Sequence, residues 1–109
     1  MKRLHVLIDD TRNLLNMDII CRTSSAAKGV LTYFGEDIEW LYLDHDLGEE
    51  VDGYQIAKWA QQNECLPSKI QLVTSNPVGR ENIAALLVGA GYKCTQGINF
   101  IKESFYCDN

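Results

Sequence analysis

Two short apolar runs of this sequence, residues 4–8 and 38–43, each lead directly into acidic residues. The acids are Asp9 and Asp10 after the first run, and Asp44 and Asp46 after the second. Two carboxylates ~4 Å apart repel each other by roughly 4 kcal/mol at an effective dielectric constant of ~20. If the fold brings the runs together, the acids need protons or a cation between them. The pattern therefore predicts a metal site, and the alternative is that each aspartate only caps a turn.

The donor set indicates which ion such a site would hold. Carboxylate oxygens are hard ligands, and neither acidic segment contains a cysteine. Oxygen donors of this kind suit Mg²⁺ or Mn²⁺. The apolar runs would then be rigid strands that hold the acids in place.

His45 lies between two of these acids in the sequence. Histidine titrates near neutral pH, so His45 is a candidate general acid or base. The alternative is a structural histidine that pairs with Asp44 or Asp46. The residues alone leave both interpretations open.

Two further groups could bind an anion. Arg12 could form a forked pair with a phosphate, or it could simply pair with Asp10. Thr74, Asn76 and Gly79 surround the start of a predicted helix, where free N–H groups and the helix dipole favour an anion. The alternative there is that Asn76 and the proline after it form an ordinary helix cap.

The elements that must position these residues alternate along the chain. Strands are predicted over residues 4–8, 18–22, 38–43, 70–73 and 92–95. Apolar residues with helical spacing follow Thr23, Asp52 and Asn76. This alternation predicts one α/β domain over residues 1–109, with a mainly parallel sheet that helices cover on both faces.

One connection and the tail depart from a regular pattern. Only residues 11–17 separate the first two strands, whereas a helical crossover takes about a dozen residues. The first helix is therefore predicted to be missing or reduced to a loop. In the tail, Ile101 and Phe105 could form one face of a short final helix.

The predicted strand order 2-1-3-4-5 brings the polar strand ends together. In an open parallel sheet, ligands bind beyond the carboxyl ends of the strands, at the switch point. This order places the first and third strands side by side there. The two acidic segments should then meet at one edge of the sheet, beside Thr74 and Asn76.

Composition limits the partners. The net charge of −5 argues against binding to an extended nucleic-acid duplex, whereas a small phosphorylated ligand remains compatible with a bound cation. The four cysteines lack C-x-x-C spacing and fit reduced thiols of a cytoplasmic protein. No segment is apolar over a length that would span a membrane. The oligomeric state is not predicted.

Four motifs in order resemble the cyclic-phosphate processing receiver domain family. They are DDTR (9–12), LDHDLG (43–48), DGYQIAKW (52–59) and SNPVGRENI (75–83). Signalling receivers carry a lysine after the fifth strand, but here residues 96–98 read Gln-Gly-Ile and Lys102 is displaced. Val73 stands where members of the family often have a histidine.

The resemblance implies a receiver-like (flavodoxin-like), three-layer fold and a metal-dependent phosphoesterase. Its substrates would be cyclic phosphates, or related phosphates of nucleotides and RNA ends. The implied roles are metal binding (Mg²⁺ or Mn²⁺) by Asp9, Asp10 and Asp44, catalysis by His45, Asp46 and Asp44, and phosphate binding by Arg12, Thr74 and Asn76. Two alternatives are a signalling receiver that is phosphorylated at Asp44, and a non-catalytic module that binds a nucleotide or a protein.

Overall fold

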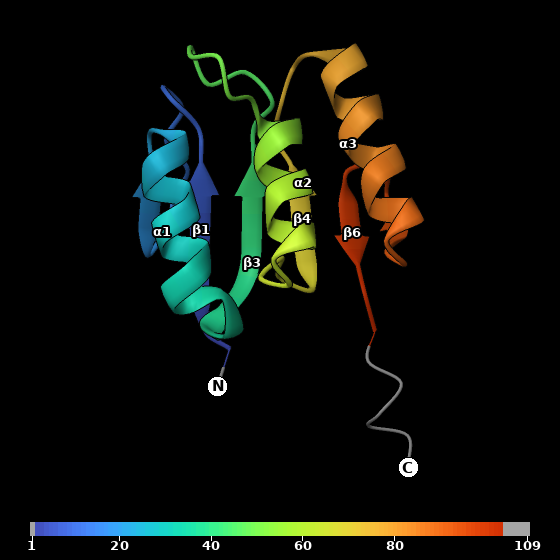
Figure 1. The fold of residues 1–109 in the computed structure, drawn as a ribbon, viewed down its shortest axis with the longest axis horizontal. Coiled ribbons are helices and arrows are strands. Elements are labelled where there is room, and N and C mark those ends of the chain that lie inside the picture. Colours follow the sequence, from blue (N-terminus) through green and yellow to red (C-terminus); the bar gives the residue numbers. More distant parts are fainter. Residues whose placement is uncertain (1, 104–109) are drawn as a thin grey trace.

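The computed structural model describes residues 2–103, which form a six-stranded sheet and three α-helices (Figure 1). In chain order the elements are β1 (Leu4–Ile8), β2 (Ile19–Cys21), α1 (Ser24–Phe34), the short 3-10 helix η1 (Gly35–Asp37), β3 (Ile38–Leu43), α2 (Gly53–Gln62), β4 (Lys69–Leu72), α3 (Pro77–Gly89), β5 (Lys93–Thr95) and β6 (Asn99–Ile101). The receiver-like α/β fold is confirmed. As predicted, the connection from β1 to β2 contains no helix.

The sheet order is β2-β1-β3-β4-β6-β5, which differs from the prediction at one edge. The first four strands are parallel, and β6 runs antiparallel to both β4 and β5. Positive φ angles at Gln96 (55°) and Gly97 (77°) reverse the chain between β5 and β6. This hairpin places Phe100, which is fully buried, beside β4.

The predicted short final helix is wrong where the structure can test it. Ile101 belongs to β6, where it pairs with Lys69. Phe105 lies outside the described residues. The helix prediction was wrong because the chain turns back after Gly97 and forms β6, which lies between β4 and β5.

All three helices lie on the same face of the sheet (Figure 1). The crossovers from β2 to β3, from β3 to β4 and from β4 to β5 advance across the sheet in one direction. Right-handed crossovers in one direction place their helices on one side, and α2 contacts both α1 and α3. Residues 2–103 therefore form two layers, and the predicted third layer is not present among them.

The core lies between the sheet and this helical layer. One cluster joins Val6 and Ile8 of β1 with Leu41 and Leu43 of β3 and with the buried faces of the helices. The alternate residues of these strands point to the other side of the sheet. Strands β1 and β3 are therefore paired in a fixed register that places Ile8 opposite Leu43.

Side-chain caps fix where the helices begin. The Thr23 hydroxyl accepts the Ala26 N–H (3.1 Å) at α1. Asp52 and Gln55 form a reciprocal capping box at α2, with both bonds 2.9 Å long. The α3 helix starts at Pro77, after the cap Asn76. None of the helices within residues 2–103 has the length and hydrophobicity that a bilayer-spanning segment needs.

Candidate metal and phosphate site

The acids of the two predicted segments meet at the carboxyl ends of β1 and β3. Asp9 follows Ile8 directly and Asp44 follows Leu43, so the paired strand ends bring them together. One carboxylate oxygen each of Asp9, Asp10 and Asp44 lies within 4.8 Å of the others. Asp9 and Asp44 are buried, and Asp10 is half-buried. The sequence-predicted ligands are thus close enough to share one cation.

Asp9 has one satisfied and one unsatisfied oxygen. Its Oδ1 accepts the backbone N–H groups of Thr11 (3.0 Å) and Arg12 (2.8 Å), which fixes the turn after β1. Its Oδ2 is buried and has no hydrogen-bond partner, although Nη1 of Arg12 lies 3.3 Å away. A buried carboxylate oxygen without a hydrogen bond is rare, and a cation ligand is one explanation for it. This oxygen therefore fits the proposed Mg²⁺ or Mn²⁺.

Asp44 carries the predicted electrostatic penalty. Burial raises the pKa of its carboxyl above the ordinary 3.8, and the charge of Asp9 raises it further. Hydrogen bonds from the Thr74 hydroxyl and the His45 N–H, and the charge of Arg12, act in the opposite direction. Because the raising effects are larger, this carboxylate is destabilised when no cation is bound.

Arg12 pairs with Asp9, and not with Asp10 as the simple alternative expected. Its Nη1 also donates to the Val73 carbonyl at the end of β4. Arg22, which the sequence analysis did not single out, forms hydrogen bonds with the backbone of this loop. Its Nη1 donates to the carbonyls of Asp9 (3.2 Å) and Arg12 (2.8 Å). The sequence could have identified Arg22, because this cation directly follows β2, the strand beside β1.

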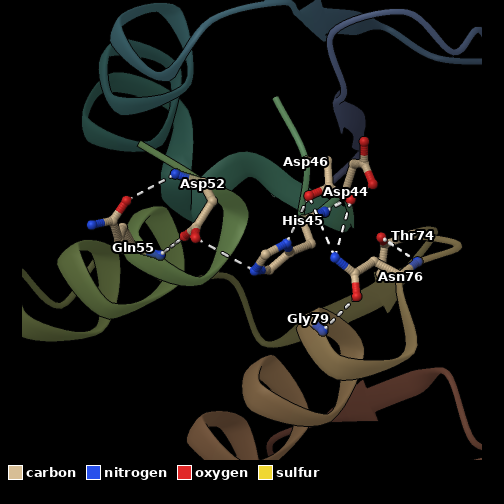
Figure 2. A network of polar contacts seen from close by, with 8 residues as sticks. All are labelled: Asp44, His45, Asp46, Asp52, Gln55, Thr74, Asn76 and Gly79. Atoms are coloured by element: carbon tan, nitrogen blue, oxygen red, sulfur yellow. Dashed lines mark hydrogen bonds and ion pairs between the residues drawn. The ribbon is translucent and has the colours of Figure 1, made fainter. Parts of the chain in front are cut away.

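His45 lies in a network of carboxylates beside the acidic cluster (Figure 2). Its Nδ1 is 3.1 Å from Asp46, and its Nε2 is 3.4 Å from Asp52 at the start of α2. Asp52 caps α2 and also contacts this imidazole. Both ring nitrogens are therefore held by carboxylates, and the side chain is only 15% exposed.

Two glycines make room for His45. A Cβ on Gly79 of α3 would lie 2.3 Å from the imidazole Cγ, and one on Gly53 of α2 would lie 2.0 Å from the Asp44 carbonyl oxygen. The N–H of Gly53 donates to the His45 carbonyl (2.7 Å). The histidine is thus packed between the first turns of two helices, which fixes its ring.

Thr74 and Asn76 lie at the same edge of the sheet, as predicted. The Thr74 hydroxyl accepts the Asn76 N–H (3.1 Å). The side-chain oxygen of Asn76 accepts the Gly79 N–H (3.0 Å), and its Nδ2 donates to Asp46 (3.3 Å) (Figure 2). The ordinary-cap interpretation of Asn76 is confirmed, and a phosphate contact by either residue remains a prediction.

Lys102 lies at the opposite end of the sheet and does not replace the lysine of signalling receivers. The residue before it, Ile101, pairs with Lys69 at the start of β4, whereas Thr74 follows the end of β4. The Lys102 ammonium group is 5.7 Å from the centre of the Tyr92 ring. The cation beside the acids is Arg12.

A comparison with protein families bears on these features. The sequence model of the cyclic-phosphate processing receiver domain matches residues 4–89, which include β1 to α3 and all of the candidate site residues. The chain belongs to this family. Comparisons with curated proteins and with solved structures gave no match.

A hollow beside His45 bears on how an anion would approach this receiver domain. It has a volume of ≈ 610 Å³ and is lined by His45, Asp46, residues 47–50 and Asp52. Glu49, Glu50 and Asp52 give this hollow a strongly negative wall. A phosphate would be repelled there, so we expect it to approach from the side of Arg12 and Thr74.

The contact between Gly79 and His45 predicts opposite effects for two glycine-to-alanine substitutions. Gly79→Ala should lower the free energy of unfolding by about 1–3 kcal/mol, because its methyl group clashes with the imidazole. A methyl group added at Gly29 in α1 would lie within 4 Å of no other atom. Gly29→Ala should therefore raise the free energy of unfolding by up to about 1 kcal/mol. Urea unfolding of both variants measures this difference. Equal effects would show that His45 is not packed against α3.

The raised pKa of Asp44 predicts a pH-dependent gain from Asp44→Asn in metal-free buffer. The folded protein binds this proton more tightly than the unfolded chain, so the stability from protonated Asp44 is fully present below about pH 3.8. It is lost as the pH rises through the folded pKa. The variant should therefore gain stability relative to wild type as the pH rises above about 3.8, whereas Glu81→Gln should not. Denaturation with EDTA present measures the free energy of unfolding, and parallel pH curves for wild type and Asp44→Asn would contradict the raised pKa of Asp44.

Proposed function

We propose that this chain is a metal-dependent phosphoesterase that opens cyclic phosphates of nucleotides or RNA ends. The observation that carries the proposal is the cluster of Asp9, Asp10 and Asp44 with the unsatisfied buried oxygen of Asp9. Membership of a family whose name refers to cyclic-phosphate processing supports the choice of substrate. The activity, the ion and the roles of individual residues are part of the proposal.

The three aspartates would hold Mg²⁺ or Mn²⁺ through carboxylate oxygens. When bound, such an ion polarises a phosphoryl oxygen and lowers the pKa of water. The protein contributes the rigid register of β1 and β3, which holds the acids together before any ion binds. It also contributes Arg12, whose charge lies beside the cluster.

Arg12, Thr74 and Asn76 would orient the phosphate. The contacts of Arg12 to Asp9 and Val73 both use Nη1, and a guanidinium has five N–H donors. The side chain is also 36% exposed. Arg12 can therefore keep its structural contacts while it donates to a phosphate oxygen. Thr74 and Asn76 would close the site from the β4 side.

His45 and Asp46 would supply the proton for the leaving oxygen. In the proposed reaction, water adds to phosphorus, one P–O bond to the ribose breaks, and the freed ribose oxygen takes up a proton. The Asp46 side chain is 64% exposed and lies 3.1 Å from His45. His45 would pass its proton through Asp46 to the ribose oxygen and take up the proton that the attacking water loses, while Asp52 holds the imidazole in place. The product is a phosphomonoester.

The signalling alternative rests on the same geometry. Asp44 ends β3 beside Thr74, as the phosphorylated aspartate of a signalling receiver would. The lysine of those proteins is not at this site, because Lys102 lies at the other end of the sheet. Mass spectrometry after treatment with acetyl phosphate separates the two functions, and a stable adduct on Asp44 would favour signalling. We expect no such adduct.

Hydrolysis of a panel of 2′,3′-cyclic nucleotides with Mg²⁺ or Mn²⁺ tests the proposal. Phosphorus NMR should show a phosphomonoester that forms with the metal and not with EDTA. Asp44→Asn should reduce the rate by about 100-fold or more, because it removes a ligand and a charge from the cluster. Glu81→Gln, an exposed substitution on α3, should leave the rate unchanged. No turnover of any substrate by the wild-type protein would refute the phosphoesterase.

A further inference from the structure

The turn that carries Asp9 and Asp10 is closed by one side chain from the neighbouring strand. Nη1 of Arg22 donates to the carbonyls of Asp9 (3.2 Å) and Arg12 (2.8 Å), which are the first and last residues of this turn. Its Nη2 donates to the side-chain oxygen of Asn13, the next residue along the chain. One guanidinium therefore joins both ends of the segment that supplies two of the three proposed metal ligands.

Arg22 pairs with the Asp9 carbonyl at the point where the ladder between β1 and β2 ends. The Asp9 N–H donates to the Cys21 carbonyl (3.0 Å), which continues the pairing of these parallel strands by one bond. The ladder stops there, because Thr23 caps α1 and the chain leaves the sheet. Without an amide of β2 to pair with, the Asp9 carbonyl accepts the guanidinium instead. The backbone of Asp9 is thus held on both sides by consecutive residues of one strand end.

We propose that Arg22 is a positioning residue for the metal site, where it holds the carboxylates of Asp9 and Asp10 ready for a divalent cation. Oδ1 of Asp9 is occupied within the turn, since it accepts the N–H groups of Thr11 and Arg12. Oδ2 is buried without a hydrogen-bond partner, so its direction depends on the geometry of the turn that Arg22 closes. Outer contacts that orient metal ligands typically change metal affinity by roughly 10–100-fold. This inference rests on the proposed metal site and does not depend on the reaction.

The contacts of Arg22 indicate that it acts through geometry. A guanidinium has no acceptor atom, so it cannot bind the cation itself. Among residues 2–103 Arg22 forms no ion pair, and its contacts go to two carbonyl oxygens and one amide oxygen. As a charge alone it would oppose the bound ion, because like charges repel. A charge effect and a positioning effect therefore predict opposite changes in metal affinity when the charge is removed.

The turn has a second, independent attachment. Nη1 of Arg12 contacts Oδ2 of Asp9 at 3.3 Å and donates to the Val73 carbonyl. The turn is thus held through its backbone by Arg22 and through a side chain by Arg12. Loss of Arg22 leaves the contacts of Arg12 in place. We therefore expect the turn to loosen in Arg22 variants while the domain still folds.

Electron paramagnetic resonance of free Mn²⁺ tests the inference, with the metal alone titrated into wild-type and variant proteins. Arg22→Lys keeps the charge but loses the planar fork, and it should weaken Mn²⁺ binding about tenfold. Arg22→Gln should also weaken binding, although it removes a like charge. Arg3→Lys is the matched control and should bind as wild type does. Arg3 is exposed and precedes β1, whereas Asp9 follows the other end of that strand.

Amide hydrogen exchange of the same proteins in EDTA separates a loosened turn from a loss of global stability. The N–H groups of Thr11 and Arg12, which donate to Asp9, should exchange faster in Arg22→Lys than in wild type. The Ala26 amide, which donates to Thr23 at the start of α1, should exchange at the same rate in both proteins.

Unchanged Mn²⁺ affinity in Arg22→Lys, or tighter binding in Arg22→Gln, would overturn the positioning role. So would hydrogen exchange that accelerates equally in the turn and at Ala26, because Arg22 would then stabilise the fold in general. Wild-type protein that binds no Mn²⁺ in the millimolar range would overturn the inference together with the metal site. Wild-type protein that binds Mn²⁺ and opens no cyclic phosphate would refute the phosphoesterase alone.

Discussion

The repulsion between the carboxylates of Asp9, Asp10 and Asp44 is the constraint on which the rest of the site depends. The parallel pairing of β1 and β3 leaves the chain no freedom to relieve it, because Ile8 and Leu43 are fixed opposite each other in the core. Arg12 offsets part of the charge, and the hydrogen bonds to Asp44 offset another part. Burial of Asp44, and after it the charge of Asp9, still raise the pKa of the Asp44 carboxyl. A divalent cation would remove this penalty and would also explain the unsatisfied oxygen of Asp9.

The loop after β3 solves a second problem, which is how to hold His45 next to these acids. The imidazole is packed against Gly79, and its nitrogens contact Asp46 and Asp52. Asp52 at the same time caps α2. One residue therefore sets both the start of a helix and the orientation of the histidine. This coupling places Asp46, the exposed member of the network, at the edge of the site.

The sequence could predict the features that local chemistry determines. Asp9 and Asp44 were identified because acids directly follow apolar strands, and Asn76 because a proline follows a capping residue. The partner of Arg12 could not be predicted, since Asp9 and Asp10 are adjacent and only the turn geometry selects one of them. The contact of His45 with Asp52 likewise depends on how the loop folds back onto α2.

The arrangement of the layers and of the last strands could not be predicted for a different reason. Strand β6 has only three residues, and a short apolar segment such as Asn99–Ile101 fits a helix or a strand equally well. Its place beside β4 depends on burial of Phe100, which is a long-range contact. The open face follows from the short β1–β2 loop together with this hairpin. Both leave the far side of the sheet without a helix in residues 2–103 (Figure 1).

The most direct test of the central claim is a crystal structure of the wild-type protein grown with Mn²⁺, measured with anomalous diffraction. The account predicts one strong anomalous peak that contacts Asp44 and at least one of Asp9 and Asp10, including Oδ2 of Asp9. Well-ordered carboxylates with no anomalous peak among them, at a Mn²⁺ concentration in the millimolar range, would contradict it.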